Sequence, residues 1–197
     1  MIEWLWIPAS AMRIAPVGVF YHDDAAKVRE VAVKSSRITH THKLGMGGAA
    51  LHAYTIALAT GLDPEETFSI ADFLKKLSTF IQDETIYLKK LDAIYRMLLE
   101  PDRGRVVAEL GHGIEAFNAV PPAIFCFLCN PDSFSQAVIQ AISLGGDTDT
   151  IGAMTGAISG ACLGCDAIPG RWKDKLENRI YIEGLAEKLF DLFMERS

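Results

Sequence analysis

Apolar residues recur at helical spacing along most of the chain, and the strict alternation typical of strands is nearly absent. Residues 23–38 begin with two aspartates and continue with valines among charged residues. This pattern predicts an amphipathic helix capped by Asp23 or Asp24. Residues 44–62 are almost entirely apolar or small, which predicts a buried helix ending near Gly61.

Four further helical segments follow. A helix is predicted to start at residues 63–66, which contain acids and a proline. A second helix is predicted to start at Pro121 and Pro122, and a third to be capped by Asp132. Residues 183–197 predict an amphipathic helix. The positions expected to face inward on the helices between residues 63 and 100 are Phe68, Phe73, Leu74, Leu77, Ile81, Leu88, Leu91, Tyr95 and Leu98. Without repeats or long linkers, the chain is predicted to be a single all-helical domain.

Composition narrows the class of protein. The chain has 197 residues, half of them apolar, which is enough for one domain with a substantial core. A net charge of -6 without a basic block argues against a nucleic-acid surface. Four cysteines and an N-terminus without a basic signal-peptide region favour an intracellular setting, in the cytoplasm, nucleus or mitochondrion. Residues 151–168 are long enough for a membrane span, but their Gly, Ala, Ser and Thr content favours a buried helix.

The most unusual stretch is an acidic cluster directly before this small-residue helix. Asp147 and Asp149 follow the glycine pair at residues 145–146. An aspartate at a helix start normally serves as a cap, which accounts for one of the two acids. Both acids together with the Thr150 hydroxyl would instead offer three hard oxygen donors, the ligands that suit Mg²⁺ or Mn²⁺. Capping and metal binding both remain open on spacing alone.

The glycines of the following helix recur at every fourth position. They are Gly152, Gly156, Gly160 and Gly164. Since a glycine costs about 1 kcal/mol relative to alanine inside a helix, the stripe predicts very close packing against a neighbouring helix. The acids would then sit at the N-terminal end of a core helix, where backbone N–H groups also favour a phosphorylated ligand.

Cysteines and histidines supply weaker candidates. Two C-x-x-C motifs, at residues 126–129 and 162–165, match a zinc signature, but their place in apolar helical runs favours buried free thiols. His52 lies in an apolar run and is predicted to be packed. His40 and His42 lie at a helix end, and His112 lies between two glycines. Any of these last three could contact a phosphate.

At the level of whole motifs, the sequence GGDTDTIGAMTGAISGA at residues 145–161 resembles the C-terminal signature of the ADP-ribosylglycohydrolase family. These are all-α hydrolases that remove ADP-ribose with the help of two divalent ions. The segments AMRIAPVGVF, ITHTHKLGMGGAALHAYTIAL and ELGHGIEAFNAVPPAIFCF resemble other family motifs in the same order. The last two of these segments are most similar to the motifs of the subclass that acts on serine-linked ADP-ribose, poly(ADP-ribose) and O-acetyl-ADP-ribose.

The resemblance implies roles for individual residues. Asp147, Asp149 and Thr150 match the family's C-terminal ligands for Mg²⁺ or Mn²⁺, and Asp147 also belongs to the substrate site. His40 matches a histidine at the ligand's phosphate region, and Ile114 an apolar residue lining the ADP-ribose site. The implied reaction is metal-dependent hydrolysis of the O-glycosidic bond at the distal ribose. The implied partners are ADP-ribosylated proteins, with a monomeric enzyme and neither nucleic acid nor membrane involved.

The resemblance covers only the C-terminal portion of a full family member, at residues 11–197, and leaves residues 1–10 as a non-family segment. The family's catalytic glutamate, its Thr-Asp-Asp cluster and its glycine-rich phosphate loop have no counterpart here, so no catalytic residue is assigned. Weak metal affinity and exposed apolar surface are therefore expected. Three functions are compatible with the sequence: an incomplete ADP-ribosylhydrolase, a non-catalytic module that binds ADP-ribose or a protein, and a zinc-stabilised structural domain.

Overall fold

A computed structural model describes residues 9–196, and within this range the chain is helical without strands, as predicted. Most of the expected non-family segment, residues 1–8, lies outside the described residues. The helices are α1 (Ala9–Met12), α2 (Ala15–Phe20), α3 (Ala25–Arg37), α4 (Lys43–Thr60), α5 (Ile70–Phe80), α6 (Thr85–Met97), α7 (Arg103–Leu110), α8 (Ala116–Cys129), α9 (Phe134–Ser143), α10 (Thr148–Leu163), α11 (Gly170–Lys173) and α12 (Arg179–Arg196).

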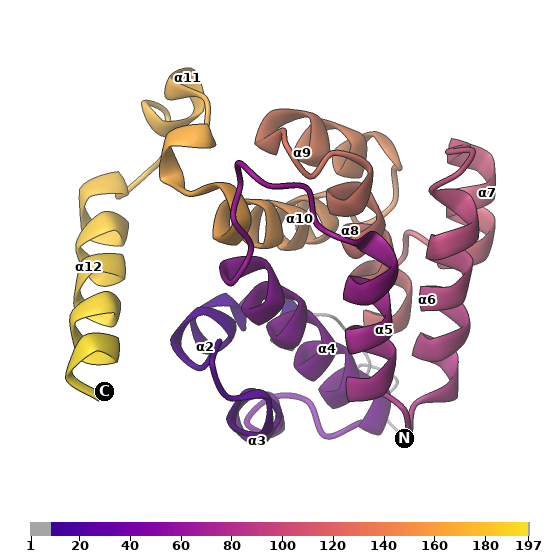
Figure 1. Ribbon diagram of the computed structural model, residues 1–197, viewed down its shortest axis with the longest axis horizontal. Coiled ribbons are helices and arrows are strands. Elements are labelled where there is room, and N and C mark those ends of the chain that lie inside the picture. Colours follow the sequence, from indigo (N-terminus) through magenta and orange to yellow (C-terminus); the bar gives the residue numbers. More distant parts are fainter. Residues whose placement is uncertain (1–8, 197) are drawn as a thin grey trace.

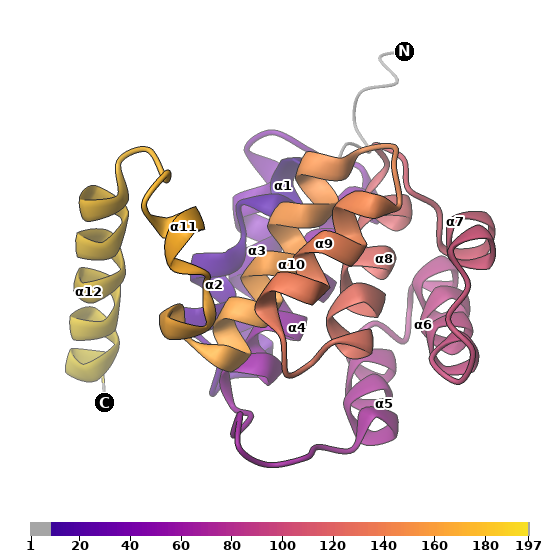
Figure 2. The same ribbon diagram turned by 90° about the horizontal axis from the view of Figure 1, so that it is seen from above.

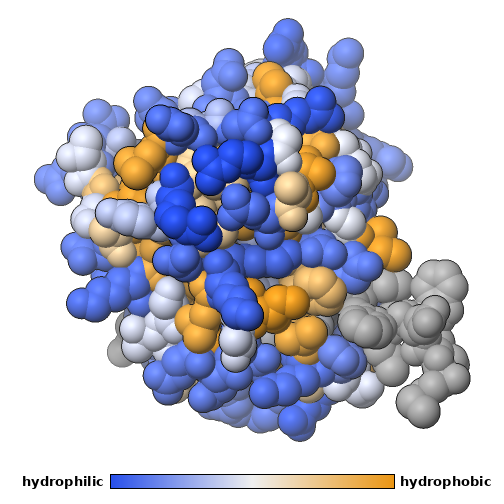
Figure 3. All heavy atoms as spheres, turned by 90° about the vertical axis from the view of Figure 1, so that its right-hand side faces the viewer, coloured by the Kyte–Doolittle hydropathy of each residue, from blue (hydrophilic) through white to orange (hydrophobic). Residues whose placement is uncertain are grey.

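Three helices form the centre of the fold. α4, α8 and α10 pack against one another, and shorter helices surround them (Figure 1). α2 and α3 cover one side of α4, α9 lies along α10, and α5, α6 and α7 form the opposite side. The short α1 contacts both α4 and α10, so it lies where two of the central helices meet. The molecular face next to α6 and α7 is largely hydrophilic, with small separate apolar patches (Figure 3).

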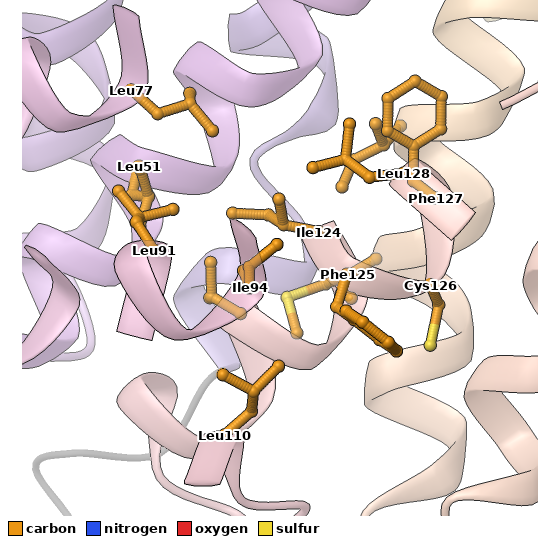
Figure 4. Packing of buried hydrophobic residues seen from close by; sticks show 14 of the residues in the cluster. Leu51, Leu77, Leu91, Ile94, Leu110, Ile124, Phe125, Cys126, Phe127 and Leu128 are labelled. Carbon is orange, nitrogen blue, oxygen red and sulfur yellow. The ribbon is translucent and has the colours of Figure 1, made fainter. Parts of the chain in front are cut away.

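The large side chains of the core are mainly leucine, isoleucine and phenylalanine. Leu51, Leu77 and Leu91 meet from α4, α5 and α6, and all three are almost completely buried (Figure 4). Phe125 and Phe127 extend the same cluster from α8 and are fully buried. Each such side chain stabilises the fold by about 1.5–3 kcal/mol when it leaves water. This core holds α8 and α10 rigidly, and the candidate site lies at the start of α10.

Several predicted helix boundaries are confirmed. Asp24 caps α3, because its carboxylate accepts a hydrogen bond of 2.9 Å from the backbone N–H of Lys27. α4 ends at Thr60, with Gly61 as the residue that follows it. Phe73, Leu74, Leu77, Ile81 and Leu91 are buried as expected.

Two predicted helix starts are wrong. Residues 63–66 form a turn, in which Asp63 accepts a 2.9 Å hydrogen bond from the N–H of Glu65, and α5 begins only at Ile70 with Ser69 as its cap. The cap of α9 is Ser133, one residue after Asp132. In each case a serine hydroxyl bonds an N–H of the first turn, because a short hydroxyl side chain reaches that group readily.

The prolines were also misplaced. α8 begins at Ala116, so Pro121 and Pro122 lie inside it. Proline lacks the N–H that a helix interior requires. Residues 119–128 of this helix are nearly all buried, and that burial outweighs the lost hydrogen bonds. Tyr95, expected to face inward, is 51% exposed because the buried face of α6 runs through Leu91 and Ile94.

The glycine stripe has more than one cause. A methyl group at Gly152 would lie 2.9 Å from Ile142 of α9, so close packing holds there as predicted. At Gly156 and Gly160 the nearest side-chain atoms would be 3.6 and 3.7 Å away, which is ordinary contact and corrects the prediction. Gly164 follows the end of α10 with a φ of 76° and no atom within 4 Å, so it serves as a left-handed helix terminator.

α12 stands apart from the other helices. None of its residues is buried, and its contacts run to α2 (Figure 2). Ile180, Phe190 and Met194 are each more than half exposed. The predicted amphipathic helix therefore forms, but most of its apolar side chains are exposed within residues 9–196. In that range no helix combines the length and apolar character needed to cross a membrane.

Candidate metal and ligand site

The acids follow a tight backbone turn. Gly145 and Gly146 have φ values of 82° and 68°, a left-handed conformation that other residues adopt only with strain. The turn lies against the loop between α7 and α8: the N–H of Asp147 donates a 2.8 Å hydrogen bond to the carbonyl oxygen of His112. A methyl group at Gly146 would lie 1.9 Å from that same oxygen. Only glycine therefore fits between the loop and the acids.

Two more contacts hold the turn. The imidazole Nδ1 of His112 lies 3.2 Å from the carbonyl oxygen of Leu144, and Arg103 of α7 donates a weaker 3.4 Å hydrogen bond to the same oxygen. Because a carbonyl oxygen only accepts, the first contact requires a proton on Nδ1. His112 thus holds the turn through both its backbone carbonyl and its imidazole ring.

Asp147 is positioned as the cap residue of α10, but it does not cap the helix with its side chain. Its φ and ψ are -82° and 64°, and its carboxylate makes no capping hydrogen bond to the first turn. The Thr150 hydroxyl and N–H nevertheless lie close enough to lower the pKa of Asp147. The carboxylate therefore faces the first turn of α10 without the geometry of a helix cap.

The two carboxyl groups lie side by side. Burial raises the pKa of Asp147, and the adjacent Asp149 carboxyl raises it further. The hydrogen bond between the same groups lowers the pKa of Asp149, which is exposed. Two carboxylates that lie next to each other repel unless a proton or a cation lies between them. The arrangement is the one that a divalent cation would stabilise.

Thr150 completes the donor set. The residue is only 6% exposed, and its hydroxyl lies 3.8 Å from the sulfur of Met12 in α1 and close to the Asp147 carboxylate, whose pKa it lowers. A hydroxyl that donates its proton in a hydrogen bond keeps its lone pairs available for a cation. Two carboxylates and this hydroxyl fit the hard-oxygen preference of Mg²⁺ or Mn²⁺. Across residues 9–196, however, no three side chains of the His, Cys, Asp and Glu types gather in a way that could hold a metal by themselves.

His40 lies in the connection between α3 and α4 and is 7% exposed. Its Nδ1 is 2.7 Å from the Thr39 hydroxyl, to which Arg13 donates a hydrogen bond of 2.6 Å. Burial lowers the pKa of His40, and the charge of Arg13 lowers it further, so the ring is neutral at pH 7. A neutral imidazole beside a guanidinium is suited to an anionic group such as a phosphate. Sequence reasoning missed Arg13, although it lies in the AMR motif.

The short α1 connects the two groups of residues. Met12 at its end contacts Thr150, and the next residue, Arg13, contacts Thr39 beside His40. Ile114 lies in the same loop as His112 and is 53% exposed. The loop therefore presents an apolar side chain to solvent while its backbone holds Asp147.

The remaining candidates have structural roles. His52 is completely buried, as predicted, with Nδ1 2.7 Å from the carbonyl oxygen of Ala11 and Nε2 3.2 Å from that of Met154. His42 caps α4 by accepting a hydrogen bond from the N–H of Leu44. The four thiols are free: Cys126 and Cys162 are buried, Cys129 is partly buried and Cys165 is exposed. Burial raises the pKa of Cys129 to about 11.

A helical domain with paired acids at the start of a central helix is the class that the fold and site define. The model of the ADP-ribosylglycohydrolase family matches residues 7–197, and the chain belongs to this family. It is 36% identical to the human ADP-ribosylhydrolase ARH3, over 94% of this chain and 58% of the human protein. An uncharacterised protein of Archaeoglobus fulgidus is 34% identical over the same shares of the two chains.

The fold agrees with this assignment. A solved structure described as an ADP-ribosylglycohydrolase-related protein complex superposes with a TM-score of 0.77 and 25% identity. The superposition covers 98% of this chain and 62% of the other. The chain thus spans less than two thirds of the length of these relatives.

Proposed function

We propose that the chain acts as part of an ADP-ribosylhydrolase that cleaves the O-glycosidic bond at the distal ribose of ADP-ribose. The proposed substrates are ADP-ribosylated serine, poly(ADP-ribose) and O-acetyl-ADP-ribose. The observation that carries the proposal is the pair of adjacent carboxyl groups, Asp147 and Asp149, beside the hydroxyl of Thr150. The human relative, whose name is ADP-ribosylhydrolase ARH3, supports the same activity.

The proposed metal is Mg²⁺ or Mn²⁺, with two ions in the complete site. Asp147, Asp149 and Thr150 would hold one side of it. When bound, such ions stabilise negative charge that develops on oxygen as the glycosidic bond breaks. The chain's own residues orient the substrate: His40 and Arg13 bind its phosphates, and Ile114 contacts its apolar surface. The N–H groups at the start of α10 add a favourable field for anions.

A second function is a non-catalytic module that binds ADP-ribose or a partner protein. It is favoured by the small number of donors, since three oxygens from one turn leave the octahedral shell of Mg²⁺ incomplete. Weak metal affinity is therefore expected of this chain under either function.

Isothermal titration with ADP-ribose and Mg²⁺ tests the binding that both functions share. We expect heat for the native chain and its loss in Asp147→Asn/Asp149→Asn. Asp166→Asn, which changes an exposed acid beyond the other end of α10, is the matched control and should bind normally. Equal heats from the native chain and the double variant would overturn the proposal. Release of ADP-ribose from an ADP-ribosylserine peptide then distinguishes the hydrolase from the binding module.

A further inference from the structure

A partly buried lysine bridges two helices next to the site. Lys90 of α6 donates hydrogen bonds of 2.6 Å to the carbonyl oxygen of Leu110 and to the side-chain oxygen of Asn118. Leu110 is the last residue of α7, and Asn118 lies in the first turn of α8. The ammonium group therefore joins the two ends of the loop at residues 111–115, which carries His112 and Ile114.

The surroundings favour the charged form of this lysine in three ways. A cation is stabilised at a helix C-terminus, where backbone carbonyls have no partner within the helix. The ring of Phe117 lies 5.4 Å from the ammonium nitrogen, which adds a cation–π contact. Glu115 attracts the charge and also accepts a 3.0 Å hydrogen bond from Asn118. Burial opposes these effects and lowers the pKa of Lys90 to about 8.

The loop at residues 111–115 packs closely against Asn118, one of the two residues to which Lys90 donates a hydrogen bond. Gly111 has a φ of 85°, and a methyl group there would lie 2.5 Å from the Asn118 side-chain oxygen. The position of Asn118 therefore determines the path of the loop as it leaves α7. At the next residue, the carbonyl oxygen of His112 accepts the hydrogen bond from the N–H of Asp147.

From this continuous series of contacts we infer that Lys90 is a positioning residue for the acidic turn. Its ammonium group holds Leu110 and Asn118, these hold the loop at residues 111–115, and the loop holds the backbone of Asp147. Lys90 itself reaches none of the proposed ligand donors. The backbone part of this inference is independent of the proposed function, and only its effect on ligand binding rests on that function.

Amide hydrogen exchange tests the inference directly. In Lys90→Met, which keeps the aliphatic stem but removes the charge, the protection factor of the Asp147 N–H should fall about tenfold, the scale of losing one hydrogen bond. The protection of buried amides in α4 should change much less. Lys89→Met is the matched control, because Lys89 is the exposed neighbour on the same helix, and it should leave both values unchanged.

A pH series on the native chain needs no variant and covers the case in which Lys90→Met does not fold. As Lys90 loses its proton between pH 7 and 9, the protection factor at Asp147 should fall. The ionisable groups near it are Glu115 at the start of α8, His112 in the loop and Glu109 of α7, which is paired with Arg96 and Arg105. Lys90→Met keeps all of these groups and should show no such step.

Two outcomes would overturn the inference. One is unchanged protection of Asp147 in Lys90→Met. The other is an equal loss at every amide, which would mean that Lys90 supports only global stability. Titration with ADP-ribose and Mg²⁺ should give weaker binding for Lys90→Met than for Lys89→Met. If the native chain binds no ADP-ribose, the proposed function fails, while the exchange results still decide the role of Lys90.

Discussion

The backbone N–H of Asp147 donates a 2.8 Å hydrogen bond to the carbonyl oxygen of His112, which joins the start of α10 to the loop before α8. Neither segment forms the candidate site alone. The turn at residues 144–147 sets the direction of the acids, and the loop keeps that turn in place. Changes to either segment should therefore affect metal binding.

The first prediction concerns the glycine between these segments. Gly146→Ala should lower the free energy of unfolding by about 3 kcal/mol or more, because it adds left-handed strain and a collision with the His112 carbonyl. Gly164→Ala shares the positive φ but has open space around it, so it should cost only about 1–2 kcal/mol. Denaturant unfolding measures both. Equal losses would show that the contact with His112 is unimportant.

A second prediction separates metal binding from stability. Thr150→Val should lower the free energy of unfolding by only about 1 kcal/mol, since the lost hydroxyl has a weak contact to sulfur and one hydrogen bond to the Asp147 carboxylate. Its affinity for Mg²⁺ should fall about tenfold, as expected on removing a hard-oxygen ligand. Calorimetric titration of Mg²⁺ provides the measurement.

Thr155→Val is the matched control for Thr150. This threonine lies one turn further along α10, is fully buried, and donates a 2.8 Å hydrogen bond to the carbonyl oxygen of Ile151. Its replacement should cost about 1 kcal/mol and leave Mg²⁺ affinity unchanged. If both variants bound the metal like the native chain, Thr150 would not be a ligand.

The third prediction is a pH dependence of stability from His52. Burial lowers the pKa of this histidine in the folded state, whereas in the unfolded chain it titrates near 6.5. The unfolded state therefore binds more protons below that pH, and stability is lost as pH falls from about 6.5 towards the folded-state pKa. The slope approaches 1.4 kcal/mol per pH unit for one proton.

His52→Gln should reduce this slope while lowering stability at pH 8, because the neutral imidazole donates its one N–H to the carbonyl group of Ala11 or Met154, and that carbonyl loses its donor. His40 contributes in the same direction, since burial lowers its pKa too. Urea unfolding at several pH values between 5 and 8 gives the slopes. A slope that is unchanged in His52→Gln would contradict the assignment.

The fourth prediction concerns the attachment of α12. Phe193 packs against Phe20 and His22 with ring centroids 6.2 and 4.9 Å apart, and Arg196 forms an ion pair with Asp23. Phe193→Ala should accelerate amide exchange throughout α12 while changing exchange in α4 and α10 little. Phe190→Ala, at a position 62% exposed on the same helix, should have almost no effect. Exchange followed by mass spectrometry would distinguish the two variants.

The sequence predicted the helical class and much of the core, because Leu77 and Leu91 follow the spacing of their own helices. It also placed Asp147, Asp149 and Thr150 together, since they are adjacent in the chain. It could not predict contacts between distant segments, such as His112 with Asp147, or Arg13 with Thr39. The start of α8 was not predicted because Pro121 and Pro122 by themselves favour a helix start. Burial of the whole helix outweighs this preference and keeps both prolines in the helix interior.

The backbone hydrogen bond between His112 and Asp147 has a thermodynamic consequence. A nucleotide that orders Ile114 would also order the backbone of Asp147, and a cation at Asp147 would in turn order the loop. Coupling of this kind is reciprocal, so each ligand should increase the affinity of the other by the same factor. Cation and nucleotide would then bind this chain cooperatively.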